Sequence, residues 1–550
     1  MDRQRTRARW SPPGWHRGLW ARALLTGALL VASGTLVGDP RLAVAADSDG
    51  QWHTITFEPK ERSGSTIGAV GSTALIAGGF LGHGTSRVVT DQVYVYDGST
   101  RQWSTARLSQ ARAGMVSAAV GGQLLFAGGN LQDFFEKSAA VDIYDSTSGQ
   151  WSSAALSEAR DAITRVTVGN KALFAGGRRR DTFELSGTVD IYDSTTGAWT
   201  TAALSEPRRD IRALVVGNKA LLVGGLMAGV EYPDLVDIYD SVTGQWTSAR
   251  LSQPRKAPIA AVVGSRVVFA GGYTFGTIQS DVVDIYDSVT GQWSTGSMSR
   301  PFSTPMLTTV GPYLLITTAV FPGPTTSNSP PSPPTLVDVY DSRTGAWTQR
   351  TLDEESLGMP HAVTVGSQAL FSVRGHLAMF DGATGQWSSA EIPGKRFSSD
   401  AASLGTTAVF LSHPSTDSLV GPVDGLPAGS TRVMVADIYN TTSGRWTSRA
   451  LAQSRYSYAI AAAGTHLLIA GGSNSQPQYR TKRIHTDVVD ILDTSTGAWS
   501  TGALLVARET PRVTRLGNQV MFSHGLLGCS GCPQDLVDGI AEVYDSQPEQ

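Results

Sequence analysis

The sequence has few of the residues on which metal and redox sites depend. Only two of its 550 residues are cysteines, Cys529 and Cys532, and its nine histidines are scattered along the chain. A zinc site at the cysteines would need two further ligands, and a redox role would need a βαβ setting that the pattern does not offer. No phosphate-binding loop, Gly-x-Ser-x-Gly turn or His-Glu-x-x-His pair occurs. We therefore predict no cofactor and no metal site.

Charged side chains and long apolar runs are also scarce. Charged residues are 17% of the chain, whose formal net charge is −3. The uncharged stretch from Ala23 to Gly38 has 16 residues, fewer than the roughly 20 that a transmembrane helix needs. It follows a segment with six arginines and precedes Ala43-Val44-Ala45, a small-x-small cleavage site. Residues 1–46 are therefore predicted to be a secretory signal peptide, with an uncleaved anchor as the alternative.

Export would change the net charge and the state of the cysteines. Loss of residues 1–45 leaves 37 Lys plus Arg and 45 Asp plus Glu, a net charge of −8. Such a chain has no overall attraction for nucleic acid. In an oxidising compartment, Cys529 and Cys532 are predicted to form a local disulfide that pins a long loop. We expect a secreted, periplasmic or cell-surface monomer with no membrane span after cleavage.

Ten tryptophans recur along the chain at near-constant spacing. From Trp103 to Trp293 the steps are 48, 48, 47 and 47 residues, and periods of roughly 40 to 50 residues are typical of propellers and solenoids. The ten are Trp52, Trp103, Trp151, Trp199, Trp246, Trp293, Trp347, Trp387, Trp446 and Trp499. A glycine follows each of them by 18 or 19 residues, which predicts a turn at the same place in ten units.

Each unit contains four short, β-rich apolar runs. In one unit these are residues 113–120, 123–127, 141–144 and 150–152. Runs of this kind, bounded by Gly, Asp and Ser, predict four antiparallel strands in a meander. Six units carry a Gly-Gly pair after the second run. We expect these pairs to let neighbouring Trp and Tyr rings approach the backbone closely.

A hydrophobic run that ends in Gly-Gly, followed by Tyr-Asp and then by Trp, resembles the kelch motif. The pattern covers nearly all of residues 52–545. The resemblance implies that residues 47–550 form an all-β fold, a β-propeller of about ten four-stranded blades. Stacked blades would bury both faces of each meander. Ten is more than the usual four to eight blades, so two abutting propellers are the alternative.

The two ends of the repeat region complement each other. The last unit ends at Val543-Tyr544-Asp545-Ser546 without a tryptophan strand, whereas Gln51-Trp52-His53-Thr54 is a tryptophan strand without partners before it. We predict that the N-terminal strand completes the last blade, which would close the ring and remove a free edge.

Variable loops point to a binding face. In a meander, the loops between second and third strands share one end of the ring with the crossovers to the next unit. These loops differ from unit to unit, whereas the turns at the other end are short and repetitive. Binding residues are most often found on variable loops of a rigid scaffold. An open funnel lined by loop residues would favour a non-catalytic module for a protein or glycan; candidate lining residues are Phe134, Phe135, Tyr232 and Phe275.

Arginine recurs nine residues after the tryptophan in seven units. We call these residues the arginine series: Arg112, Arg160, Arg208, Arg255, Arg396, Arg455 and Arg508. Each opens an innermost strand, so the guanidinium groups could surround the channel mouth and bind an anionic ligand. In kelch proteins that bind acidic peptides, arginines at this strand start contribute to the binding face. The alternative is structural: each arginine braces the crossover through carbonyls or a neighbouring Asp.

Two enzyme classes built on related propellers were weighed as alternatives. Copper propellers of the galactose oxidase type need a Cys–Tyr cross-link, a second Tyr and two His ligands, and this chain would have lost such a site. A mutarotase-like enzyme acting on an acidic sugar would use arginines at the channel mouth without a metal. Because a fold does not determine function, a binding module remains the first hypothesis, and we predict no catalytic residue.

Overall fold

Short β-strands make up the described part of the chain. The computed structural model describes residues 43–46, 52–56, 62–82, 86–132, 136–179, 184–229, 234–256, 258–274, 278–302, 305–318, 334–353, 360–373, 375–396, 398–413, 423–424, 433–474, 484–523, 526–527 and 540–547. All of them belong to one compact unit, residues 40–550. The one named helical element among them is a 3-10 turn, η2 (Pro393–Lys395). The predicted all-β fold class is confirmed.

Nine sheets have four antiparallel strands each, and we number them along the chain. Sheets 1 to 3 are β4 (Thr66–Val70), β5 (Thr73–Ala77), β8 (Gln92–Asp97) and β9 (Gln102–Arg107); β10 (Val116–Val120), β11 (Gln123–Ala127), β12 (Ala140–Asp145) and β13 (Trp151–Ala155); and β14 (Thr164–Val168), β15 (Lys171–Ala175), β16 (Thr188–Asp193) and β17 (Trp199–Ala203). Sheets 4 to 6 are β18 (Arg212–Val216), β19 (Lys219–Val223), β20 (Leu235–Asp240) and β21 (Trp246–Arg250); β22 (Ile259–Val263), β23 (Arg266–Ala270), β26 (Val282–Asp287) and β27 (Trp293–Ser297); and β28 (Met306–Val310), β29 (Tyr313–Thr318), β30 (Thr335–Asp341) and β31 (Trp347–Asp353). Sheets 7 to 9 are β32 (His361–Val365), β33 (Gln368–Val373), β34 (His376–Asp381) and β35 (Gln386–Glu391); β36 (Asp400–Leu404), β37 (Thr407–Ser412), β38 (Val435–Asn440) and β39 (Arg445–Ala450); and β40 (Ala459–Ala463), β41 (His466–Ala470), β42 (Val488–Asp493) and β43 (Trp499–Ala503).

The tenth sheet joins the two ends of the repeat region. It contains β45 (Arg512–Leu516), β46 (Gln519–Ser523), β48 (Ile540–Asp545), β2 (Trp52–Thr56) and β1 (Ala43–Ala46), in this order. Trp52 lies opposite Tyr544 in this sheet, as Trp151 lies opposite Tyr144 in sheet 2. The prediction that the N-terminal strand completes the last blade is therefore confirmed. The pairing of β1 outside β2 was not predicted.

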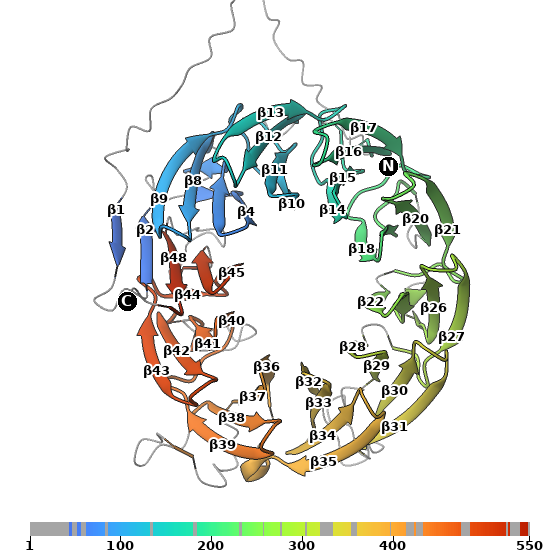
Figure 1. Ribbon diagram of the computed structural model, residues 1–550, viewed down its shortest axis with the longest axis vertical. Helices are drawn as coiled ribbons and strands as arrows, with labels where there is room; N and C mark the ends of the chain where they lie inside the picture. The colour runs from blue at the N-terminus through green and yellow to red at the C-terminus, as the bar shows by residue number, and fades with distance from the viewer. Residues whose placement is uncertain are drawn as a thin grey trace, which may run out of the picture. The chain divides into compact units, whose positions relative to one another are not determined.

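The hydrophobic core is divided among the junctions between sheets. Each of ten buried clusters combines apolar side chains of two consecutive sheets, and one of them joins sheet 10 to sheet 1. In that cluster, Ile55 and Val543 pack with Ile76 and Tyr96. The series of junctions therefore returns to its start, as the ring of sheets in Figure 1 shows. One closed series accounts for every sheet in the described residues.

Aromatic pairs fix the outer strands. The ring centroids of Tyr144 and Trp151 are 5.3 Å apart, and Trp151 also stacks on Phe126 at 6.3 Å. Trp151 packs against the junction with sheet 1. The tryptophan repeat thus marks an outer strand whose aromatic ring adds to the burial of apolar area at the junction.

Candidate functional site

The strand directions give the unit two distinct ends. Turns between first and second and between third and fourth strands form the turn end. Connections between second and third strands and the crossovers to the next sheet form the loop end. We name these two ends here and keep the names below.

Small ribbons stiffen the loop end. The residue after several arginines of the series pairs with the segment that follows the Gly-Gly turn, as in Asp161 with Arg178 and Tyr456 with Ser473. The named strands of these ribbons are β3 (Arg62–Ser63), β6 (Phe80–Leu81) and β7 (Val88–Val89); β24 (Tyr273–Thr274) and β25 (Ile278–Gln279); and β44 (Arg508–Glu509) and β47 (Leu526–Leu527). The backbone at the base of these loops is therefore paired and held against the sheet.

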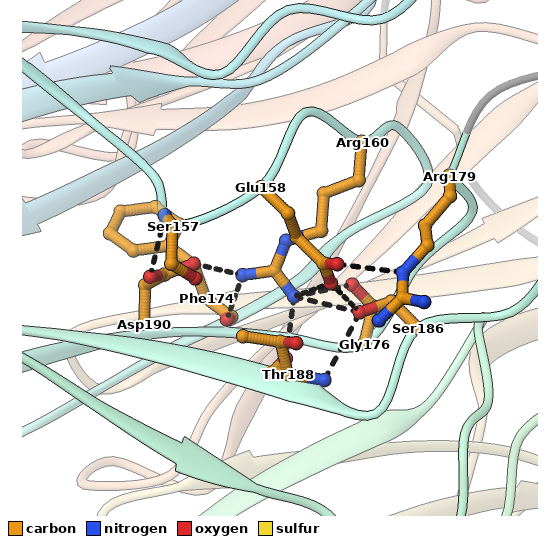
Figure 2. Close-up of polar contacts among 9 residues, drawn as sticks. All are labelled: Ser157, Glu158, Arg160, Phe174, Gly176, Arg179, Ser186, Thr188 and Asp190. Atoms are coloured by element: carbon orange, nitrogen blue, oxygen red, sulfur yellow. Dashed lines mark hydrogen bonds and ion pairs between the residues drawn. The ribbon is translucent and has the colours of Figure 1, made fainter.

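The guanidinium groups of the arginine series lie inside the sheets. Six of the seven are fully buried and Arg396 is 8% exposed. The terminal nitrogen of Arg208 donates to the Leu222 carbonyl at 3.2 Å and to Asp237 at 2.7 Å. Figure 2 shows the same arrangement at Arg160, whose guanidinium contacts the carbonyls of Phe174, Gly176 and Thr188 and the carboxylate of Asp190.

Each arginine of the series has an acidic partner on the third strand of the same sheet. The pairs are Arg112–Asp142, Arg160–Asp190, Arg208–Asp237, Arg255–Asp284, Arg396–Asp437, Arg455–Asp490 and Arg508–Glu542. The carboxylates also accept backbone N–H groups of the crossover, for example that of Ser157 on Asp190 at 2.9 Å. Each pair therefore fixes the crossover to the sheet.

The sequence carried a signal for these partners that our sequence analysis missed. An acidic residue stands nine positions before the tryptophan in seven units, as Asp142 does before Trp151. Sheet 7 has Ala378 at the acidic position and Ser356 at the arginine position, so both partners are absent together. In sheet 1, Tyr94 replaces the acid, and Arg62 lies 4.9 Å from the centroid of its ring.

Burial and ion pairing shift the pKa of these arginines in opposite directions. Burial lowers the pKa of Arg112, Arg160 and Arg255, and the neighbouring carboxylates oppose the shift. Arginine keeps its proton inside proteins, so each buried pair carries two charges that depend on each other. Removing one partner would leave the other charge buried and unpaired.

The Gly-Gly turns receive the backbone of the next crossover. The N–H of Gly177 donates to the Arg208 carbonyl at 3.0 Å. A Cβ on Gly176 would lie 2.2 Å from that same carbonyl oxygen, and Gly177 has φ +107°, which favours glycine. Our expectation that the pairs make room for Trp and Tyr rings is therefore wrong: they make room for a carbonyl group.

Every described contact of the arginine series agrees with the structural interpretation, in which each arginine braces the crossover. The guanidinium groups point toward the second and third strands, and their charge is engaged by carboxylates. Nothing in this geometry leaves them facing a ligand, and we place no ligand on them. The predicted disulfide of Cys529 and Cys532 lies outside the described residues.

A different set of polar side chains gathers at the loop end of sheets 7 to 9. We call it the rim cluster: His361, Asp400, His413, Tyr456 and Tyr458. His361 and Asp400 open β32 and β36, the first strands of two adjacent sheets, and Tyr458 directly precedes β40. All five side chains are partly exposed. Our sequence analysis did not single them out, because they belong to no repeated position.

Direct contacts join members of the rim cluster. The rings of His413 and Tyr456 pack against each other at a tilt of 31°, with centroids 4.1 Å apart. The Tyr458 hydroxyl bonds Asp400 and Ser399, and Oδ1 of Asp400 accepts the Ala401 N–H at 2.8 Å. Nδ1 of His413 is buried without a hydrogen-bond partner among the described residues.

The rim cluster holds neutral imidazoles beside one carboxylate. Burial lowers the pKa of His413 to about 4 and also lowers the pKa of His361, and in both cases Asp400 partly opposes the shift. Burial, followed by the charge of Asp400, raises the pKa of Tyr458. Burial therefore disfavours protonated imidazoles beside the Asp400 carboxyl group.

Two further observations concern the described residues alone. Within them, no group of three or more His, Cys, Asp or Glu side chains is arranged to hold a metal ion. Likewise, the described segments include no helix with the length and hydropathy to cross a membrane.

Comparison with known proteins supports the repeat assignment over part of the chain. Residues 64–258 match the family model described as the KLHDC2/KLHL20/DRC7 Kelch-repeats domain, which confirms the kelch resemblance for sheets 1 to 4. No curated protein matches the chain. A solved structure titled "Structure of YjhT" aligns with 53% of this chain and 98% of its own, at 16% identity and a TM-score of 0.30.

Proposed function

We propose that this chain is an exported, non-catalytic binding module that takes a protein or glycan at its loop end. The observation that carries the proposal is the contrast between the two ends. The turn end repeats one structure from sheet to sheet, and the loop end varies on a stiffened base. Selection for a binding surface would produce this contrast, because the scaffold must stay fixed while its loops diversify.

The turn end is uniform in chemistry. Asp145 accepts the backbone N–H groups of Thr147 and Ser148, which closes the hairpin between third and fourth strands. The same bonds recur at Asp240 and at Asp287. Lys219 and Arg266 pair with these aspartates. Such bonds satisfy the turn itself and leave little that would distinguish one ligand from another.

The loop end differs between sheets even at its base. Lys137 and Arg178 both pair with Asp161 between sheets 2 and 3, whereas His485 lies 3.4 Å from Glu509 at the crossover to sheet 10. The rim cluster belongs to sheets 7 to 9 alone. These differences would let one end of the unit present several distinct surfaces.

The alternative of an enzyme acting on an acidic sugar loses its main support. That alternative needs free arginines at the channel mouth, and the guanidinium groups of the series are buried and paired.

The export part of the proposal rests on the basic segment, the apolar stretch and the Ala43-Val44-Ala45 site. Fractionation of cells that express the full chain would test it, and retention of the chain in the cytoplasm would count against it.

The binding face can be tested with matched substitutions at the two ends. Ile278 and Ile484 are exposed at the loop end, and Val242 and Val289 are exposed at the turn end. The purified protein would first be screened against glycan and peptide arrays. We expect Ile278→Arg or Ile484→Arg to weaken capture of the ligands found, and Val242→Arg and Val289→Arg to leave it unchanged. Loss of capture in the turn-end variants alone would overturn the proposal.

A further inference from the structure

We infer that the rim cluster binds a primary ammonium group, such as a lysine side chain or an amino terminus, between the Asp400 carboxylate and the ring of Tyr456. This inference rests on the proposed function, because it names a ligand chemistry for one part of the loop end. It differs from our earlier expectation of an anionic ligand on the arginine series.

The position brings the side chains together from three sheets. β32 and β36 are neighbours in the ring, and their first residues, His361 and Asp400, interact electrostatically. His413 follows β37, the strand that pairs with β36. From the next sheet, Tyr456 packs against the His413 ring and Tyr458 bonds Asp400. Residues that converge from separate sheets form a site whose geometry the fold fixes.

The charge balance favours a cation. Among the described residues, Asp400 has hydrogen bonds but no ion-pair partner. The two nearest arginines of the series are already engaged, Arg396 by Asp437 and Arg455 by Asp490. Burial lowers the pKa of both imidazoles, so the histidines do not offset the acidic side chain of Asp400. An anionic ligand would be repelled, whereas a cation would neutralise a partly buried carboxylate.

The surface suits an organic cation better than a hydrated metal ion. Tyr458 bonds the carboxylate, and the Tyr456 ring packs on His413, which also interacts with Asp400. Ring faces attract ammonium groups. A metal ion would need several oxygen or nitrogen ligands, and no metal-binding group is found in the part of the chain that the structure describes. An ammonium group needs only the carboxylate and one ring face.

Ligand-observed saturation-transfer NMR on the full chain would test the inference. The probes are N-acetyl-lysine-methylamide and n-butylammonium, with N-acetyl-norleucine-methylamide as the uncharged isostere and pentanoate as the anion. We expect saturation of the two ammonium probes only. A stronger response to the norleucine compound or to pentanoate would overturn the inference. A response to butylammonium alone would assign the site to a free amine, and equal responses would extend it to lysine side chains.

Matched variants separate binding from folding. We expect Asp400→Asn to weaken the lysine probe about tenfold, which equals the 1.4 kcal/mol of a modest charge-assisted contact. Asp210→Asn removes an exposed carboxylate at the loop end of sheet 4 and should change nothing. Tyr456→Phe should keep binding and Tyr456→Leu should lose it. Unchanged binding in both Asp400→Asn and Tyr456→Leu would overturn the inference.

The outcome is distinguishable from that of the proposed function. If the ammonium probes fail while array ligands still depend on Ile278 or Ile484, the loop end binds something else and the rim cluster is not its site. If array ligands depend only on the turn end, the proposed function fails as well. Because Asp400→Asn also replaces a charged acceptor of the Tyr458 hydroxyl by a neutral one, its melting temperature would be measured beside its binding.

Discussion

At the scale of single residues, the most informative side chains are the arginines that the sequence repeats and the fold buries. A guanidinium group offers a planar set of donors, and here each serves one carboxylate, with a second-strand carbonyl added at Arg112, Arg160, Arg208, Arg255 and Arg455. The carbonyl of the same arginine accepts the N–H of the preceding sheet's Gly-Gly turn, as Arg208 does from Gly177. Such an arginine therefore bonds its own sheet through the side chain and the preceding sheet through its carbonyl group.

The pairing predicts a strong coupling between Arg208 and Asp237. Arg208→Met leaves a buried carboxylate without its cation, and we expect the free energy of unfolding to fall by about 3–5 kcal/mol. Asp237→Leu should lower the free energy of unfolding by a similar amount, because it leaves the guanidinium buried without its carboxylate. The double variant should lower it by clearly less than the sum of the two single effects, because no charge remains buried. Denaturant unfolding of the four proteins measures this coupling, and additive costs would contradict it.

A second prediction concerns the residue two positions after the arginine. Ala162 has φ +50° there, whereas the equivalent residues in sheets 1 and 2 are Gly64 and Gly114 with φ +65° and +64°. Alanine is strained in this region. We expect Ala162→Gly to stabilise the protein by about 0.5–1 kcal/mol, after the entropy cost of glycine is subtracted. Thermal melting would measure the gain.

The control for this substitution lies in a strand. Ala172 is buried in β15, where glycine has no conformational advantage. We expect Ala172→Gly to lower stability. If both substitutions were destabilising, the positive φ of Ala162 would not be the source of strain that we infer.

At the scale of elements, β2 differs from the other outer strands. Strands such as β13 and β17 expose most of their side chains, whereas Trp52 to Thr54 and Ile55 are buried in β2. Ile55 stands where β13 has Ala154, and it packs into the cluster that joins sheet 10 to sheet 1. The N-terminal strand therefore contributes core as well as hydrogen bonds.

We expect Ile55→Ala to destabilise the whole protein by about 2–5 kcal/mol, the usual cost of a cavity in a packed core. Deletion of residues 47–58 should have a larger effect, because it also removes the strand from sheet 10. Val242→Ala, at an exposed turn, is the control and should change stability little. A melting curve that the deletion leaves unchanged would show that the strand is not part of the folded sheet.

At the scale of the whole molecule, the junctions form two belts of polar contacts around the apolar clusters. Near the turn end, the residue that opens a second strand meets the aromatic residue of the next sheet, as Gln123 accepts the Tyr192 hydroxyl at 2.8 Å. His466 and Tyr544 join at 2.7 Å in the same way, and Gln519 donates across the closure to the Gly98 carbonyl of sheet 1 at 3.1 Å. At the loop end, the Gly-Gly bonds form the second belt.

The stability of the molecule should depend on pH in two separate windows. His413 has a pKa of about 4 in the folded protein and about 6.5 when unfolded, so the unfolded chain binds more protons between these values. Stability is then highest above pH 6.5 and falls as the pH drops toward 4. We expect this loss to be smaller in His413→Gln, as measured by melting temperature across the range.

Acidic turn residues act in the lower window. Hydrogen bonds and lysine partners lower the pKa of Asp193 and Asp240 to about 2, so their contribution is present above the unfolded pKa near 3.9 and is lost as the pH falls toward 2. Because these groups are already charged at pH 5, they leave the histidine window undisturbed. Equal pH dependence of the parent and His413→Gln proteins between pH 6.5 and 4 would contradict the assignment to His413.

The sequence by itself determined the meander, the repeat and the closure by the N-terminal strand. These depend on alternating apolar residues, turn glycines and tryptophans, whose local preferences are the same wherever the unit lies in the ring. The tertiary structure alone decided what the arginine series does, because a guanidinium at a strand start can face the channel or its own sheet, and only the position of the acid on the third strand selects the sheet. The tertiary structure also determines which side chains form the rim cluster. His361, Asp400 and Tyr458 lie far apart in sequence and share no motif, and only the packing of three consecutive sheets brings them together.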